Sequence, residues 1–278
     1  MDVNLAKKRF ADDLLGGKVA LVSGSGSGMG QATAIEMARC GAKVVLYGRT
    51  PEKLEKTAEI IRSAGGDVLP IQGDTRETEQ IQAAHDQIKE HWGRLDILVN
   101  NAGGQYVSPA KDITFTGFDA VIRNNLYATW YMTKLAADNF MFENGGKIIN
   151  VTAVVKQALS GFAHSVAARG GVVALSKTLA HEWARYGILI NCVAPGTVKS
   201  FPDGHYPIAM GTWEKSNRNL LNRMGRSEDI SGMITFLASE LGDFITGEEF
   251  YVDGGETLNV SHSAADLIDP DLKAKQGH

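Results

Sequence analysis

Short, continuous runs of Val, Ile and Leu alternate with longer amphipathic segments along almost the whole chain. A continuous apolar run predicts a strand buried on both faces, as in a parallel sheet covered by helices. The amphipathic segments between the runs predict helices, so the alternation indicates an α/β fold with a doubly wound parallel sheet. The seven expected strands are 18–24, 42–48, 67–73, 95–101, 146–152, 188–194 and 248–254. The expected helices are roughly 28–40, 51–64, 76–92, 117–142, 160–186 and 227–239.

The length favours one domain that spans residues 1–278, because two full domains would both be small. Residues 197–225 break the alternation after the expected sixth strand. A long insertion at the carboxyl end of a strand usually lies where such sheets bind ligands, so we expect it to cover the substrate. The alternative is a surface excursion without a role.

Charge and composition exclude several classes of partner. The net charge of -4 and the lack of a long Lys/Arg run argue against nucleic acid. The two cysteines, Cys40 and Cys192, fit neither a disulfide framework nor a metal site. No apolar run approaches the ~18 residues of a membrane span. The first residues, MDVNLAKKRF, do not resemble a signal peptide, so a cytoplasmic protein without a membrane partner is expected.

The first expected strand ends in a glycine-rich turn, VSGSGSGMGQA, which opens the first helix. Glycines at this point permit a tight turn and close approach of backbone N–H groups to a pyrophosphate. The spacing of Gly24, Gly28 and Gly30 is G-x-x-x-G-x-G rather than G-x-G-x-x-G, and a purely structural turn is the alternative. The position between strand and helix favours a Rossmann-type dinucleotide site. The expected cofactor contacts here are Ser23, Gly24, Ser27, Gly28, Met29 and Gly30.

The ends of the second and third expected strands bear on the choice of cofactor. NAD binding calls for a carboxylate after the second strand, where this chain has Arg49. A guanidinium suits a 2′-phosphate, so NADP(H) is favoured over NAD(H), unless Arg49 is only a solvated residue at a helix start. Asp74 and Thr75 follow the third strand, where an acid can accept from the adenine amino group.

Small residues follow two later strands. Asn101, Ala102 and Gly103, in NNAG, would let the chain pass close to the adenosine ribose. Pro195 and Gly196 end the sixth strand, and Val198 follows where the backbone could meet the nicotinamide amide. Each of these motifs is short and is weak evidence by itself. Their order along one chain is specific evidence for a dinucleotide site.

In these motifs the chain resembles the short-chain dehydrogenases/reductases over roughly residues 15–256. The motifs are SGSGSGMG, NNAG, Asn125 in NNL (124–126), NVT (150–152), INCVAPG (190–196), FITG (244–247) and VDGG (252–255). The resemblance implies a nicotinamide dinucleotide and a homo-oligomer, often a tetramer. The family's usual catalytic pair is Y-x-x-x-K, and Ser165 and Arg169 stand in its place here. The family's usual serine falls at Thr152 or Ala153.

One branch, the peroxisomal trans-2-enoyl-CoA reductases, is similar in these departures as well. The shared elements are NNAGGQY (100–106), SPA (108–110), Lys156, HS (164–165) and AAR (167–169). The 2,4-dienoyl-CoA reductases also abandon the usual pair, but the tyrosine or acid that they use is not found here, and Val155 stands near that place. The resemblance implies hydride addition to the β-carbon of a CoA thioester, which leaves an enolate that hydrogen-bond donors can stabilise.

The residues expected to carry the chemistry are Asn125, Ser165, Arg169, Lys156 and Tyr106. Ser165, Lys156 or a water held by Asn125 could stabilise the enolate, and Arg169 would hold the nicotinamide ribose. Tyr106 could supply a phenol or form an apolar wall. Structural alternatives remain: Ser165 as a helix cap, Lys156 as a solvated side chain or a CoA phosphate ligand, and Asn125 as a brace. His164 is more typical of a hydrogen-bonded surface histidine than of a catalyst.

Three functions therefore compete at this point. The first is an NADPH-dependent enoyl-CoA reductase. The second is a carbonyl or alcohol oxidoreductase with a non-standard proton donor. The third is an inactive family member that still binds the dinucleotide. The tail from Leu258 to His278 has no clear pattern; it could cover the active site of a neighbouring subunit or be frayed.

Overall fold

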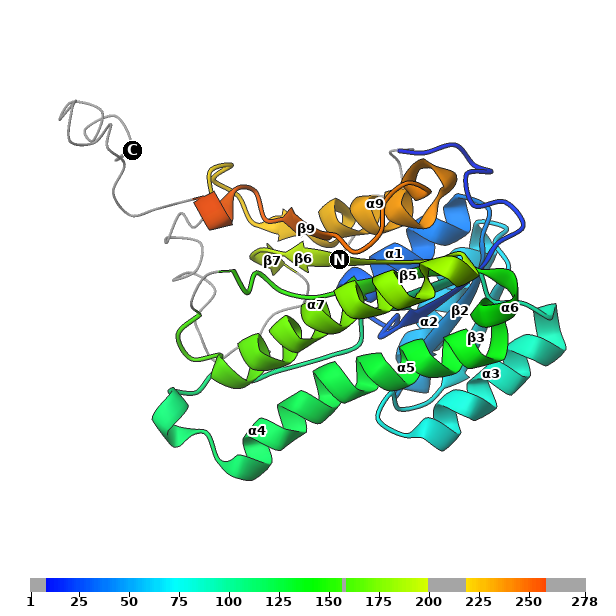
Figure 1. Ribbon diagram of the computed structural model, residues 1–278. Coiled ribbons are helices and arrows are strands. Elements are labelled where there is room, and N and C mark those ends of the chain that lie inside the picture. The colour runs from blue at the N-terminus through cyan, green and yellow to red at the C-terminus, as the bar shows by residue number, and fades with distance from the viewer. Residues whose placement is uncertain (1–8, 157–158, 200–218, 259–278) are drawn as a thin grey trace.

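A seven-stranded parallel sheet forms the centre of the molecule, in the order β3-β2-β1-β4-β5-β6-β9 (Figure 1). The computed structural model describes residues 9–156, 159–199 and 219–258. The strands are β1 (Val19–Ser23), β2 (Lys43–Gly48), β3 (Val68–Gln72), β4 (Ile97–Asn100), β5 (Gly146–Val151), β6 (Ile188–Pro195) and β9 (Glu249–Val252). The predicted doubly wound sheet is confirmed, and the order reverses between β1 and β4, where such sheets bind ligands.

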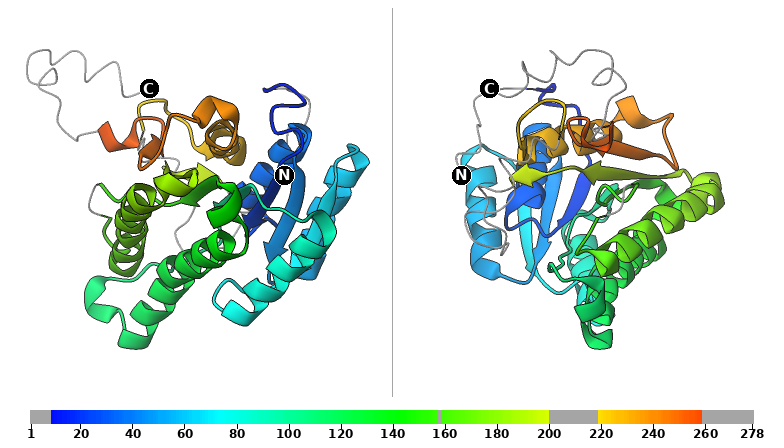
Figure 2. Two further views of the ribbon diagram at one scale, coloured as in Figure 1. Left: turned by 45° about the vertical axis from the view of Figure 1, so that its right-hand side comes forward. Right: turned by 90° about the vertical axis from the view of Figure 1, so that its left-hand side faces the viewer.

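Two layers of helices cover the two faces of the sheet (Figure 2). Adjacent residues of a strand point to opposite faces, so Leu98 packs in one hydrophobic cluster and Val99 in the other. One cluster includes residues of α1 (Gly28–Arg39), α2 (Pro51–Ser63) and α9 (Ser227–Ala238). The other includes residues of α3 (Thr78–Trp92), α5 (Ala128–Ala136) and α7 (Ala163–Trp183). This double coverage explains why most strand residues are apolar.

The helix predicted over 117–142 is interrupted twice. It consists of α4 (Phe115–Ile122), a π turn η2 (Arg123–Tyr127), α5, a second π turn η3 (Ala137–Met141) and α6 (Phe142–Asn144). In η2 the Ala128 amide donates to the Arg123 carbonyl, five residues back. Turns of this kind often occur at functional sites, and η2 contains Asn125.

A row of buried polar side chains ties three strands to α7. Asn100, Asn150 and Cys192 are partners in register across β4, β5 and β6. Asn100 Nδ2 donates to Asn150 Oδ1 at 2.8 Å, and Asn150 Nδ2 donates to Ser176 Oγ of α7 at 2.8 Å. Cys192 Sγ donates to the same hydroxyl at 3.2 Å. These bonds hold α7 against the sheet, with its first turn at the carboxyl edge of the strands.

The insertion begins and ends in a small parallel ladder. β7 (Val198–Lys199) pairs with β8 (Gly225–Arg226) and so joins its two ends. Residues 200–218 lie outside the described residues, so the predicted covering role stays a prediction. Short 3-10 turns complete the chain at η1 (Ala110–Asp112), η4 (Ala184–Tyr186), η5 (Glu240–Gly242) and η6 (Glu256–Leu258). None of the helices within the described ranges has the length and apolarity needed to cross a membrane.

Candidate active site

The glycine turn between β1 and α1 has the geometry of an anion cradle. Gly24 and Gly28 adopt positive φ angles of 68° and 57°. A Cβ on Gly30 would lie 2.4 Å from the Gly24 carbonyl oxygen, so only glycine fits there. The first turn of α1 contains no acidic residue, and the Ser27 side chain makes no capping bond. The positive end of the helix is therefore available to a phosphate.

Two further observations fit a ligand at this turn. Ser25 Oγ is buried and has no hydrogen-bond partner among the described residues. The Ser23 hydroxyl accepts from the backbone amides of Asn101 and Ala102, both at 3.0 Å, which fixes the NNAG loop beside the turn. Asn101 Nδ2 also donates to the Ser23 carbonyl at 3.0 Å. The predicted contacts after β1 and β4 are thus brought together.

The predicted adenosine end contains a cluster of charges. Arg49 is exposed directly after β2, and its carbonyl accepts from Gln72 Nε2 at 3.3 Å. The Asp74 carboxylate accepts from Arg76 Nε at 2.9 Å. Hydrogen bonds from Arg76 hold the pKa of the Asp74 carboxyl below its ordinary value, against the effect of burial. Sequence reasoning missed Arg76; its spacing of two residues from Asp74 was the available signal. Thr75, between them, is buried.

Gly103, Asn125 and Arg169 meet at the carboxyl edge of β4 and β5. A Cβ on Gly103 would lie 2.3 Å from Arg169 Nη2 and 2.5 Å from Asn125 Oδ1. Asn125 Nδ2 donates to the Gly104 carbonyl at 2.8 Å, and its Oδ1 accepts from the Gly104 amide at 3.2 Å. Arg169 Nη1 donates to the Val151 carbonyl at 2.7 Å. The structure therefore brings two of the predicted catalytic residues together around one glycine.

Ser165 and His164 lie in the first turn of α7. Ser165 is 5% exposed and Arg169, one turn later on the same face, is 7% exposed. His164 is fully buried, so the expectation of a surface histidine was wrong. His164 lies on the buried face of α7, and the Tyr106 ring packs against its imidazole. The residue type alone could not predict this burial. Burial lowers the pKa of His164, and the Phe162 backbone opposes this in part.

The phenol of Tyr106 lies away from Asn125. A Cβ on Gly117, in the first turn of α4, would be 2.2 Å from the Tyr106 hydroxyl. Eight residues separate Gly117 from Asn125, which corresponds to about 12 Å along a helix. The ring contacts His164 edge-to-face at a centroid distance of 4.5 Å. Tyr106 therefore forms part of the wall near the start of α4.

Lys156 is exposed on the loop that follows β5, with Nζ 6.0 Å from the centre of the Tyr251 ring. The Tyr251 hydroxyl donates to Glu249 Oε2 at 2.9 Å, and Thr152 Oγ1 donates to Glu249 Oε1 at 3.3 Å. Burial, and then the bond to Glu249, raise the pKa of Tyr251 to about 12. Sequence reasoning missed Glu249, which is remote in the chain. Thr152, at the family's serine position, is thus directed toward β9.

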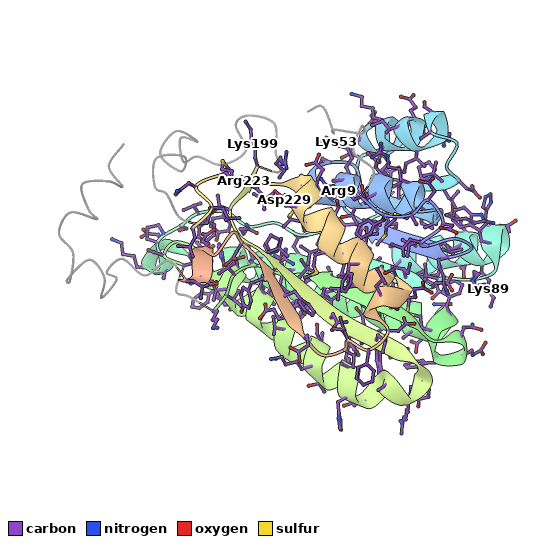
Figure 3. All side chains as sticks on the ribbon, turned by 90° about the horizontal axis from the view of Figure 1, so that it is seen from above. Arg9, Lys53, Lys89, Lys199, Arg223 and Asp229 are labelled. Atoms are coloured by element: carbon purple, nitrogen blue, oxygen red, sulfur yellow. The ribbon has the colours of Figure 1, made fainter. Side chains whose placement is uncertain are left out.

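Backbone groups complete the edge of the site after β6. The Gly196 amide donates to the Val252 carbonyl at 3.1 Å, and a Cβ there would lie 2.7 Å from Asp253. Pro195 ends β6, and Val198 lies in β7. Figure 3 labels Lys199, Arg223 and Asp229 close together near the start of α9, where Arg223 Nη1 donates to Asp229 Oδ2 at 2.7 Å.

A family model described as enoyl-(acyl carrier protein) reductase matches residues 24–257. A Bacillus subtilis protein described as a probable 2,4-dienoyl-CoA reductase, (2E)-enoyl-CoA-producing, is 36% identical over 250 residues, 87% of this chain and 97% of its own. A Danio rerio protein described as a peroxisomal 2,4-dienoyl-CoA reductase, (3E)-enoyl-CoA-producing, is 32% identical over 266 residues, 93% of this chain and 88% of its own.

Two solved structures share the fold. The citronellol catabolism dehydrogenase AtuB of Pseudomonas aeruginosa PAO1 superposes with a TM-score of 0.81 at 35% identity, over 89% of this chain and 98% of its own. A short-chain dehydrogenase of Burkholderia cenocepacia J2315 in complex with NADP has a TM-score of 0.80 at 27% identity, over 87% of this chain and 99% of its own.

Proposed function

The chain belongs to the short-chain dehydrogenase/reductase family, and we propose that it is an NADPH-dependent reductase of an enoyl-CoA-type substrate. Members of this family are oxidoreductases that bind a nicotinamide dinucleotide. The finer parts of the proposal are the preference for NADPH, the conjugated thioester and the residues that act on it.

The cofactor proposal depends on the fit of the glycine turn and Arg49. The turn offers backbone amides at the positive end of α1 and the unpartnered hydroxyl of buried Ser25. Arg49 makes no side-chain hydrogen bond among the described residues and lies near Asp74, whose pKa it helps to lower. The planar guanidinium of Arg49 would bind the 2′-phosphate of NADP(H) through two N–H groups. The residues proposed to contact the cofactor are those predicted from the sequence after β1, β2, β3, β4 and β6.

The proposed chemistry is reduction of the double bond conjugated to a thioester. NADPH, when bound, supplies the hydride. Negative charge would then develop on the thioester oxygen, where fixed donors are worth on the order of 3 kcal/mol each, and a proton from solvent would complete the reduction at the α-carbon. We assign this role to the Ser165 hydroxyl. Arg169 stays charged near neutral pH and is anchored to Val151, so it would orient the nicotinamide ribose rather than transfer a proton.

One observation carries the proposal. Ser165 and Arg169 are buried on one face of α7, with Arg169 beside Asn125, while the Tyr106 phenol packs against Gly117. Such a site offers hydrogen-bond donors at the position where the family usually has an acid. An enolate needs donors, whereas a developing alkoxide needs a proton from an acid of matched pKa. The arrangement therefore favours the conjugated thioester over a ketone.

Binding of the CoA part involves groups farther out. Lys156 is exposed on the loop after β5, within reach of solvent, and we assign it to a CoA phosphate. Asn125 braces the Gly103–Gly104 segment, so its proposed contribution is to position that segment and Arg169. The homotetramer and the cytoplasmic location stay predictions from the sequence.

A carbonyl or alcohol substrate is the second candidate. It is favoured by the similarity to AtuB, which is described as a citronellol catabolism dehydrogenase, at 35% identity. In that case a group other than Ser165 must provide the proton. An inactive protein that retains the dinucleotide site is the third possibility.

The test is NADPH oxidation at 340 nm with short and long trans-2-enoyl-CoA, a 2,4-dienoyl-CoA, 3-oxoacyl-CoA and a set of ketones. Turnover of the conjugated thioesters alone supports the proposal. Turnover of ketones alone contradicts it and supports the second candidate. Silence on all substrates, with NADPH still bound in a fluorescence titration, favours the inactive protein.

A further inference from the structure

The imidazole of His164 is completely buried, yet only one of its nitrogens is paired within the part of the chain that the structure describes. Nδ1 accepts the backbone N–H of Ser165 at 2.8 Å. Nε2 has no hydrogen-bond partner among the described residues. Buried polar atoms are nearly always paired, because an unpaired one loses its hydration without compensation. The Nε2 atom in the first turn of α7 is therefore available to a ligand.

The bond to Ser165 determines which nitrogen carries the proton. A nitrogen that accepts a hydrogen bond bears no proton, so the neutral ring holds its proton on Nε2. Ser165 is the third residue of α7, and its N–H is one of the amides that the helix itself leaves unpaired. The positive end of the helix also disfavours a charged imidazolium. With Nδ1 as the acceptor of this bond, the neutral ring of His164 is a donor at Nε2.

Tyr106 packs directly on this donor. Its ring meets the imidazole at an interplanar angle of 79°, and 40% of the residue is exposed. The loop that carries it is fixed at Ser108, whose amide donates to the Gly161 carbonyl just before α7 at 3.0 Å. The Tyr106 side chain therefore lies between the buried imidazole and solvent.

We propose that His164 Nε2–H is a second hydrogen-bond donor to the thioester oxygen of the substrate, beside the Ser165 hydroxyl, once the Tyr106 ring moves aside. This inference rests on the proposed enoyl-CoA activity. Two donors from consecutive residues at the positive end of a helix would face the oxygen on which charge develops. Removal of one such donor typically lowers turnover by about 10²-fold.

Two substitutions test the roles of the two ring nitrogens of His164 separately. His164→Asn keeps an acceptor near the position of Nδ1, which can still bind the Ser165 amide, but it lacks a donor at the reach of Nε2. His164→Gln places an amide donor near the position of Nε2. We expect H164N to keep its Tm and NADPH affinity, and to lose about 10²-fold in kcat with crotonyl-CoA. H164Q should recover part of that loss. Turnover of H164N within about twofold of the parent protein, or equal losses in both variants, overturns the proposal.

A second measurement does not depend on the variants or on turnover. In protein labelled with ¹⁵N-histidine, the imidazole resonances of His164 report its tautomer and the hydrogen bond at Nε2. The resonances are assigned by their absence from H164N or, if that variant does not fold, by through-bond correlation to the backbone. Addition of NADP⁺ with butyryl-CoA should slow exchange of the Nε2 proton and move its resonance downfield. Saturation with butyryl-CoA that leaves this resonance unchanged contradicts a bond to the thioester oxygen.

The two proposals fail in different ways. If the parent protein does not reduce crotonyl-CoA or any other conjugated thioester, the proposed function fails before His164 is tested. If the parent protein reduces crotonyl-CoA and H164N does so equally well, the function stands and only the role of His164 fails.

Discussion

Asn125 and Gly104 form a reciprocal amide pair. The Asn125 Nδ2 donates to the Gly104 carbonyl at 2.8 Å, and the Gly104 N–H donates to Asn125 Oδ1 at 3.2 Å. Nδ2 also donates to the Val121 carbonyl at 2.7 Å. A side chain that is fully buried inside a π turn thus holds the loop after β4 in place.

Asn125→Ala should destabilise the protein, because it leaves the half-buried backbone groups of Gly104 without their hydrogen-bond partners. The expected loss is about 2 kcal/mol in the free energy of unfolding. Urea denaturation measures it. Asn124→Ala, in the same turn, serves as the control and should cost much less. Equal losses in the two variants would mean that the reciprocal pair does not matter to stability.

Gly103→Ala should disturb the site, because its Cβ would lie 2.3 Å from Arg169 Nη2. A displaced guanidinium should lower kcat by about 10²-fold. The matched control is Gly104→Ala, whose Cβ would come no closer than 3.3 Å to Asn124 Nδ2. Steady-state kinetics with the best substrate decide the matter, and similar kinetics for the two variants would argue against close packing at Gly103.

Ser165→Ala should lower turnover more than cofactor affinity, because the proposed bond is to the substrate oxygen. We expect kcat to fall by about 10²-fold, with the Kd for NADPH unchanged. Stopped-flow turnover and a fluorescence titration measure the two quantities. Ser160→Ala, exposed before α7, is the control. An unchanged kcat in S165A would remove Ser165 from the mechanism.

Arg49→Ala should change the KM for NADPH and the KM for NADH by different amounts. Loss of a charge-assisted bond to the 2′-phosphate should raise the KM for NADPH by about tenfold or more and leave the KM for NADH nearly unchanged. Arg62→Ala, on the exposed side of α2, should change neither constant. A parallel increase for NADH and NADPH would show that Arg49 does not read the phosphate.

His85 should make the protein less stable in mild acid. The His85 ring extends from α3 and is buried against the second π turn, where it meets Asn139. Burial lowers the pKa of His85 from 6.5 to about 4. Protonation therefore favours the unfolded chain. The contribution of His85 is complete above pH 6.5 and is lost as the pH falls from 6.5 toward 4, by roughly 3 kcal/mol in all.

Urea denaturation at pH 7 and at pH 4.5 tests this effect. His85→Phe keeps an aromatic ring against Phe140 and should flatten the pH dependence, whereas substitution of exposed His91 should not. The same slope in H85F and the parent protein would assign the acid sensitivity to other groups.

The strands and most helices could be predicted because their signals are local. Seven apolar runs and the glycines after β1 suffice for the sheet and the cofactor turn. The π turns could not be predicted, because each shifts the register of the helix by one residue, and a short amphipathic pattern does not reveal so small a shift. The direction of the Tyr106 phenol depends on Gly117 in another element. The bond between Thr152 and Glu249 joins residues 97 positions apart. Such contacts depend on the packed fold rather than on neighbouring residues.

Each π turn also constrains how the chain can change in length. A π turn accommodates one extra residue within a helix, so later side chains keep the directions they would have in a regular helix that is one residue shorter. Thr133, which accepts from Asn100 Nδ2 at 2.9 Å, reaches its partner because η2 absorbs that residue. Loss of a single codon within Arg123–Tyr127 should therefore leave a regular helix with Thr133 still directed toward the sheet. Within α5, between the two π turns, loss of a codon should be tolerated less readily than within either turn.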